Sequence, residues 1–433
     1  MSLVGLRSAT TSLLRGVKPG RLALLGNGNA DQQRTIVMKE RLRLPENYPE
    51  PWDYKNKGYS YMLNVLDDTK ARMHANSKLI VVEGSVACGK SQFAQELADS
   101  LGMLYMPDFR MESVLIDRYG NDMRDYYHLF PKVFRVPDLG MFFKNPLDST
   151  SAVMQDRIQE CRWEQYMNAL AHILNTGQGV VLDRSFYGDH VFANAMRAKN
   201  YIGEEYFNHY YYMRKRGDKT IPLMPHLFIY LKAPVEVSLR NIQKRGNPDE
   251  IKTVDETYLK IVEASYTDAL KEFRRYSHVL AYDWSTPGNT DSVVADIEKI
   301  EMDFYHEKVH GEVTRGWHEM AKNDKWWIMR NKATNKIFAR IETFPNVLAH
   351  EVSELYYTPI EAQEMIDAMQ KHVLKSRYAH GYIKERGDDL MKPLMNFRFG
   401  HSMPEIWYEY YWKEAWYHDF FSLSSAINAQ YNH

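Results

Sequence analysis

The sequence is poor in cysteine, has no long apolar run and carries no excess of charge of either sign. Its 433 residues include two cysteines, Cys88 and Cys161, which excludes a disulfide framework and a four-cysteine zinc site. No apolar run approaches the roughly eighteen residues that a membrane-spanning helix needs. Lysine and arginine number 55 and aspartate and glutamate 56, so no overall field attracts nucleic acid, and no nucleic-acid partner is expected.

Motifs for redox and metal chemistry are also absent. The chain has no G-x-G-x-x-G dinucleotide fingerprint and too few cysteines for an iron–sulfur cluster. Its sixteen histidines are dispersed without the spacing of metal ligands, and no serine lies in a nucleophile elbow. These absences argue against redox chemistry by residues of this chain.

The N-terminal segment has the composition of an import signal. Its first thirty residues are basic, contain serines, threonines and scattered leucines, and have no acid before Asp31. A mitochondrial presequence needs such a basic, acid-poor helix. Residues 1–35 are therefore predicted to be a presequence that directs the protein to the mitochondrial matrix, and a disordered tail is the alternative.

Short apolar segments alternate with helical patterns through the middle of the chain. The predicted strands are 78–83, 103–106, 179–183, 226–231 and 278–282. The predicted helices are 90–101, 148–175, 234–244, 255–276 and 290–305. Strands that alternate with helices favour a parallel sheet covered on both faces. We therefore predict an α/β domain, residues 78–305, built on a five-stranded parallel sheet.

Two flanking regions differ from this domain. Residues 36–77 contain Pro45, Pro49 and Pro51 and are predicted to be an extended arm with a short helix around Tyr59 to His74. Residues 306–433 hold six of the nine tryptophans, and the segment Ile406 to Phe421 is dense in aromatic residues. Such a region favours docking to a partner, whereas packing on the domain itself and contact with lipid are the alternatives.

The first predicted strand runs into a phosphate-binding loop, GSVACGKS, at Gly84 to Ser91. Gly84 and Gly89 let the backbone N–H groups point at phosphate oxygens, and the following helix N-terminus favours an anion. Lys90 can bridge the outer phosphates, and the Ser91 hydroxyl can complete a magnesium shell. Cys88 is interpreted as a small side chain that fills the loop, with oxidation sensing as the alternative.

Two further segments carry groups suited to phosphate. Asp183 and Arg184 follow the third strand, so they lie at the carboxyl edge of the sheet, where ligands bind. They can hold magnesium and neutralise a phosphate, or they can simply cap the next helix. Arg240, Lys244 and Arg245 share one face of a later helix, which is either a mobile basic lid or a solvated helix end.

These motifs, together with the KAPVEVSLRNIQKR segment and the order of elements, resemble the deoxynucleoside kinase family over about residues 78 to 305. With its flanking regions, the whole chain is similar to the deoxynucleoside-kinase-like accessory subunits of mitochondrial NADH:ubiquinone oxidoreductase, respiratory complex I. The resemblance implies a P-loop nucleoside/nucleotide kinase-like fold. It also implies a set of nucleotide-binding residues. These are Gly84, Ala87, Gly89, Lys90, Ser91, Arg184, Arg240 and Arg245, and Ser91 and Asp183 are the expected Mg²⁺ ligands.

Two departures from the family pattern concern catalysis. Active members place a glutamate before a Pro-Val pair to take the proton from the sugar hydroxyl, and this chain has Met106-Pro107-Asp108 instead. The family lid has arginines on both sides of its turn, whereas Asn247 follows Gly246 here. Both changes weaken phosphoryl transfer.

The resemblance therefore implies an accessory subunit of complex I with no catalytic residues of its own, on the matrix side of the inner membrane and in contact with other subunits. A purine nucleotide or deoxynucleotide, with Mg²⁺, is the expected ligand, and an adenine dinucleotide such as FAD is an alternative. A working mitochondrial deoxynucleoside kinase is the second hypothesis. In that case Asp108, Asp183 and Arg184 would be the catalytic residues.

Overall fold

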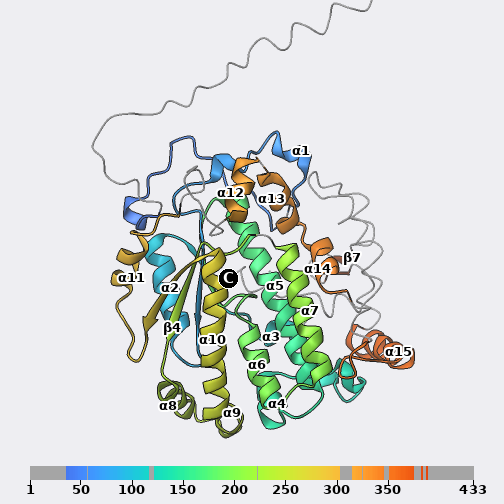
Figure 1. Ribbon diagram of the computed structural model, residues 1–433. Helices are drawn as coiled ribbons and strands as arrows, with labels where there is room; N and C mark the ends of the chain where they lie inside the picture. The colour runs from blue at the N-terminus through green and yellow to red at the C-terminus, as the bar shows by residue number, and fades with distance from the viewer. Residues whose placement is uncertain are drawn as a thin grey trace, which may run out of the picture. The chain divides into compact units, whose positions relative to one another are not determined.

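A parallel sheet forms the centre of the computed structural model (Figure 1). The structure describes residues 36–374, apart from 56, 117–120, 222, 303–314, 324 and 346–350, together with 382–383 and 387–388. The sheet has five strands in the order β2-β3-β1-β4-β5, and all neighbours are parallel. This confirms the predicted fold class. The strands are β1 Leu79–Gly84, β2 Leu104–Met106, β3 Val180–Asp183, β4 Leu227–Lys232 and β5 His278–Asp283.

Alternating side chains of the strands give the sheet an apolar layer on each face. In β1, Leu79 and Val81 belong to one buried cluster, and Ile80 and Val82 belong to the other. Figure 1 shows α2 and α11 on one side of the sheet and α5, α6 and α7 on the other. Both faces are therefore covered, which is why the central strands β1, β3 and β4 are mostly apolar.

The helices that the periodicity predicted are present. The described helices are α1 Tyr61–Asn64, α2 Lys90–Leu101, α3 Glu112–Leu115, α4 Leu139–Lys144, α5 Thr150–Thr176, α6 His190–Ala198, α7 Glu204–Thr220, α8 Val235–Arg245, α9 Pro248–Thr253, α10 Glu256–Tyr276, α11 Thr290–Ile297, α12 Arg315–Lys322, α13 Trp326–Thr334, α14 Ile337–Thr343 and α15 Pro359–Ala368. The sequence did not predict α6 and α7. Helix α11 ends at Ile297, earlier than the predicted end at Tyr305.

The helix predicted around Tyr59 to His74 is shorter than expected. The arm contains only the single turn α1 and a 3-10 turn at Lys70–Arg72. Between them the chain turns so that the carboxylate of Asp67 reaches Arg72 and Arg330. Ion pairs formed in the folded chain therefore override local helix propensity here.

Arg330 of α13 ties the arm to the far end of α5. Its side chain is fully buried, and its Nε donates to Asn175 Oδ1 at 2.7 Å. Its guanidinium also donates to Thr69 Oγ1 at 3.1 Å and lies 3.9 Å from the ring centre of Tyr59. These contacts connect three segments that are remote in the sequence.

Two of the C-terminal tryptophans pack on the domain itself. Trp317 and Trp326 are buried in the larger apolar cluster, and Trp317 Nε1 donates to Met224 O at 2.7 Å. Trp407, Trp412 and Trp416 lie outside the described residues. Among the helices that the structure describes, none has the length and apolar character required to cross a membrane.

Candidate functional site

The loop between β1 and α2 has the backbone shape of a phosphate-binding loop. Ala87 and Gly89 have φ values of +58° and +83°, which turn the chain sharply before α2 begins at Lys90. A Cβ atom on Gly84 would lie 2.9 Å from Cys88 Sγ and 3.1 Å from Leu231 O, so only glycine fits there. Burial raises the pKa of the Cys88 thiol, which supports its interpretation as a small group that fills the loop.

Asp183 at the end of β3 holds the two functional side chains of the loop. Its carboxylate lies 2.6 Å from Lys90 Nζ and accepts a hydrogen bond from Ser91 Oγ at 2.5 Å. Asp183 is fully buried. Hydroxyl and carboxylate oxygens are the ligands that Mg²⁺ prefers, so Ser91 and Asp183 fit the predicted metal site once phosphate oxygens and water supply the remaining ligands.

Arg184 is fixed beside the loop. Its φ is +66°, an uncommon conformation for a residue other than glycine, and its guanidinium donates to Ser85 O at 3.4 Å. The guanidinium also lies 4.4 Å from the ring centre of Phe192 and pairs with Asp108 at 3.3 Å. Arg184 thus lies at the carboxyl edge of the sheet, as predicted from its position after the third strand. The structure also brings it together with Asp108.

Asp108 is held between cations. Its Oδ2 lies 3.4 Å from a guanidinium nitrogen of Arg162, in addition to its pair with Arg184. Burial raises the pKa of Asp108, but the charges of Arg162, Lys90 and Arg184 more than offset this, and the net pKa is lowered. A paired carboxylate with a lowered pKa is a poor proton acceptor.

A buried polar network around Arg162 was missed at the sequence level. Arg162 of α5 pairs with Asp189, which also accepts hydrogen bonds from Gln155 at 2.9 Å and from Tyr210 at 2.6 Å. Gln155 and Arg162 are seven positions apart, or about two turns of helix, and lie among buried apolar residues. Polar residues on the apolar face of a predicted helix were the available signal.

Glu83 was also missed, although it directly precedes the loop. Its carboxylate is buried and accepts hydrogen bonds from Ser185 N at 3.0 Å, Ser185 Oγ at 2.9 Å and Tyr266 OH at 3.1 Å. Burial raises the pKa of Glu83. These bonds connect the phosphate loop to the segment that carries Arg184.

The basic helix α8 contacts the loop through an amide instead of an arginine. Asn241 Nδ2 donates to Ala87 O at 2.9 Å. Arg245 pairs with Glu250 at 2.9 Å, and Asn247 caps α9 by accepting from Asp249 N at 3.1 Å. Arg240 is exposed, and neither predicted lid arginine bonds to the loop among the described residues.

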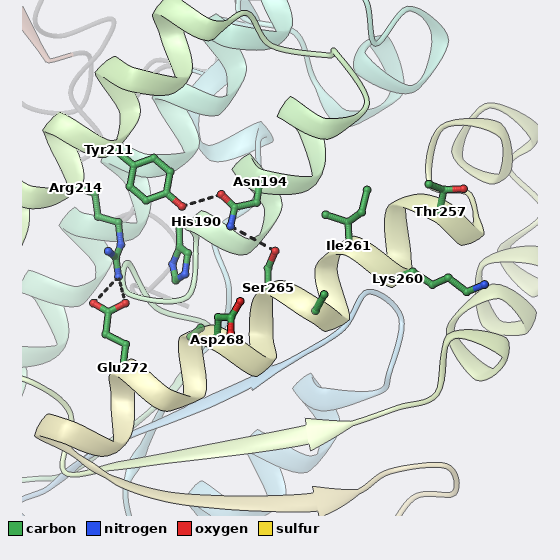
Figure 2. Close-up of a pocket in the computed structure, with 12 residues that line it drawn as sticks. His190, Asn194, Tyr211, Arg214, Thr257, Lys260, Ile261, Ser265, Asp268 and Glu272 are labelled. Atoms are coloured by element: carbon green, nitrogen blue, oxygen red, sulfur yellow. Dashed lines mark hydrogen bonds and ion pairs between the residues drawn. The ribbon is translucent and has the colours of Figure 1, made fainter.

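A separate cavity of about 480 Å³ lies between α6, α7 and α10 (Figure 2). None of the residues that line this cavity belongs to the phosphate loop. Its lining includes His190, the first residue of α6.

Comparison with known proteins agrees with this geometry. The family model for deoxynucleoside kinase matches residues 80–320. The chain is 30% identical over 336 residues to NADH dehydrogenase [ubiquinone] 1 alpha subcomplex subunit 10, mitochondrial, of Mus musculus, covering 76% of this chain and 88% of that protein. It is 28% identical over 231 residues to deoxyguanosine kinase of Dictyostelium discoideum, covering 53% of this chain and 72% of that enzyme.

Solved structures of deoxynucleoside kinases are also similar. Deoxyadenosine kinase from M. mycoides with bound dATP is 16% identical, with a TM-score of 0.39, and the match covers 51% of this chain and 100% of that one. The chain belongs to the deoxynucleoside kinase family and is homologous to the mitochondrial subunit 10 proteins of NADH dehydrogenase.

Proposed function

We propose that this protein is a non-catalytic accessory subunit of mitochondrial NADH:ubiquinone oxidoreductase that has kept a nucleotide site. The observation that carries the proposal is the extent of the similarity to the mouse subunit. That similarity runs over 336 residues and 88% of the mouse protein, whereas the Dictyostelium kinase shares 231 residues. The similarity to the subunit therefore extends beyond the region that the chain shares with the kinase.

The proposed ligand is a purine nucleotide or deoxynucleotide, with an adenine dinucleotide such as FAD as the alternative. The backbone from Gly84 to Gly89 would hold the phosphates, Lys90 would neutralise them, and Ser91 and Asp183 would hold Mg²⁺. A bound Mg²⁺ would supply further positive charge at the phosphates. A nucleotide present at about a hundred times its dissociation constant adds about 2.7 kcal/mol to the free energy of unfolding. The site would thus stabilise the subunit for assembly.

Two features of the site support the absence of turnover. Asp108, the nearest acid to the position of the family base, is paired with Arg162 and Arg184 and has a lowered pKa. Arg245 is paired with Glu250, so its charge is already neutralised. Asp108 would therefore be a poor acceptor for the proton of the sugar hydroxyl, and Arg245 is less available to stabilise the charge of the transferred phosphate.

We infer that the protein lies on the matrix side of the inner membrane, where residues 1–35 would deliver it. Residues 306–433 would dock on other subunits of the complex, while residues 78–305 form the kinase-like domain and residues 36–77 the arm. The buried contacts of Trp317 and Trp326 assign the first part of that C-terminal region to packing on the domain. Docking is then left to the later aromatic residues.

Native gel electrophoresis of gently solubilised mitochondria tests this role. The protein is expected to migrate entirely with a very large assembly that contains NADH dehydrogenase activity. A dominant pool of free protein, no larger than the 50.9 kDa of the full chain, would refute the proposal.

The second candidate function is an active deoxynucleoside kinase, which the complete loop and the similarity to deoxyguanosine kinases favour. Incubation of the pure protein with ATP and each deoxynucleoside separates the two. We expect no product that depends on Lys90. Turnover that Lys90→Ala abolishes would establish the kinase.

A further inference from the structure

The cavity between α6, α7 and α10, which we call the α6–α10 groove, has the features of a second binding site. It is lined by His190 and Asn194 of α6, Tyr211 and Arg214 of α7, and Ile261 and Ser265 of α10, among others. Figure 2 shows these side chains converging from the three helices. A volume of about 480 Å³ lies within the range of small-molecule sites.

His190 presents an unused hydrogen-bond acceptor to this groove. Its side chain is 6% exposed, and its Nδ1 lies 2.9 Å from Tyr187 O. A carbonyl oxygen only accepts, so Nδ1 must carry the proton, and Nε2 of the neutral ring is then a bare lone pair. No residue in the described part of the chain hydrogen-bonds to Nε2. Its donor must therefore come from water or from a molecule bound in the groove.

The ring stays neutral at physiological pH. Burial, together with the charge of Arg214, lowers the pKa of His190 to about 3. The lone pair on Nε2 is therefore available at neutral pH.

The other polar groups of the groove already satisfy one another. Tyr211 OH donates to Asn194 Oδ1 at 2.7 Å, and Asn194 Nδ2 donates to Ser265 Oγ at 3.4 Å (Figure 2). This chain of bonds fixes three side chains around His190 in one arrangement. A ligand would meet a preformed wall, which lowers the entropic cost of binding.

The charges along the groove are also paired. Arg214 bonds both carboxylate oxygens of Glu272 at 3.1 Å. On the exposed face of α10, Lys260 lies 2.6 Å from Glu256 and Asp268 lies 2.7 Å from Lys271. An ionic ligand would have to break one of these pairs, so the wall favours a neutral one.

The remaining surface of the groove is apolar. Ile261, Ala264 and Ala269 of α10 lie on one side, and the ring of Tyr211 lies on the other. The small side chains of the two alanines leave room for a flat body between the helices.

We propose that the α6–α10 groove binds a small neutral molecule with an apolar, ring-sized body and one O–H or N–H group that donates to His190 Nε2. The groove does not use the phosphate loop. Ser265 faces the groove, whereas the next residue, Tyr266, bonds Glu83 and Gly84 on the loop side of α10. The proposal therefore stands independently of the nucleotide site.

Phenol and toluene are a matched pair of probes, because they have nearly the same shape and only phenol carries a donor. The full-length protein with ¹⁵N-labelled histidine would be titrated with each, and the imidazole nitrogens followed by NMR. The free protein should show His190 as the Nδ1–H tautomer. Phenol should shift the Nε2 signal upfield in a saturable way, and toluene should leave it unchanged.

Variants at His190 extend the test. His190→Gln keeps a donor for Tyr187 O and an acceptor for the ligand, and should retain phenol binding measured by ligand-observed NMR. His190→Phe should lose it, and His209→Phe, on α7 outside the groove, should behave like the wild type. Protonation of His190 at Nε2, an equal response to toluene, or the absence of saturation by phenol in the wild-type protein would each overturn the proposal.

Discussion

The ammonium group of Lys90 and the carboxylate of Asp183 form a buried ion pair with a separation of 2.6 Å. The second oxygen of the same carboxylate accepts a hydrogen bond from Ser91. One acid at the end of β3 therefore positions both the cation that meets phosphate and the hydroxyl suited to magnesium. In the proposed nucleotide site, this arrangement would compensate for the few charges of the loop itself.

The first prediction concerns Lys90. A saturating nucleotide is expected to raise the free energy of unfolding of the wild-type protein by about 2.7 kcal/mol at a hundred times the dissociation constant. Lys90→Ala should remove most of this gain, because the phosphates lose their cation. Thermal unfolding with and without dATP and ADP measures the difference. Lys215→Ala, at an exposed position on α7, is the control, and an equal nucleotide effect in Lys90→Ala would contradict the prediction.

The second prediction concerns the metal. Addition of Mg²⁺ should tighten nucleotide binding to the wild-type protein, since Ser91 and Asp183 offer oxygen ligands beside the phosphates. Asp183→Asn should lose this dependence on Mg²⁺ while keeping binding in its absence. Calorimetric titrations in Mg²⁺ and in EDTA give the four affinities. The same Mg²⁺ effect in wild type and variant would show that the metal is held elsewhere.

The third prediction concerns the buried Arg330. Arg330→Ala removes one of the two cations that pair with Asp67, which keeps its ion pair with Arg72, and takes the donor from Asn175 Oδ1. It is expected to lower the free energy of unfolding by about 2–3 kcal/mol, because hydrogen bonds to a charged group are lost. Because Arg330 also contacts Thr69 and Tyr59, the arm should become sensitive to protease. Denaturant unfolding and limited trypsin digestion provide the measurements. Lys322→Ala, an exposed position on α12, should change neither, and a protected arm in Arg330→Ala would refute the role of this residue.

The fourth prediction concerns acid stability. His226 is fully buried, and its Nδ1 accepts a hydrogen bond from Leu79 N at 3.0 Å, so this nitrogen must be unprotonated in the folded state. Burial lowers the pKa of His226 well below its usual value. The unfolded chain therefore binds the proton more readily, and stability should fall as the pH drops below about 6.5. His226→Asn, whose Oδ1 can accept from Leu79 N, should reduce the dependence of the free energy of unfolding on pH. Thermal unfolding at several pH values from about 7.5 down to about 5 measures this dependence for both proteins. Parallel slopes would exclude His226 as the cause.

Much of the fold could be predicted because its signals are local. Each strand is a short apolar run, and the loop at Gly84 to Ser91 combines small residues with a lysine at a fixed spacing. The parallel topology then places Asp183 and Arg184 at the carboxyl edge without further information. Helix α7 was missed because its polar and aromatic residues hide the helical period.

The sequence by itself thus determined the sheet, the loop and the edge at which a ligand would bind, since neighbouring residues encode these features. Only the tertiary structure decided how the charges pair. Arg330 and Asp67 are 263 positions apart, and Arg162 reaches Asp108 across 54. Such pairs depend on how helices and strands pack, because the partner of a long charged side chain is whichever group the fold places within about 3 Å of it. For the same reason the sequence does not reveal that Arg245 pairs with Glu250. Nor does it reveal that Nε2 of His190 faces a groove between helices.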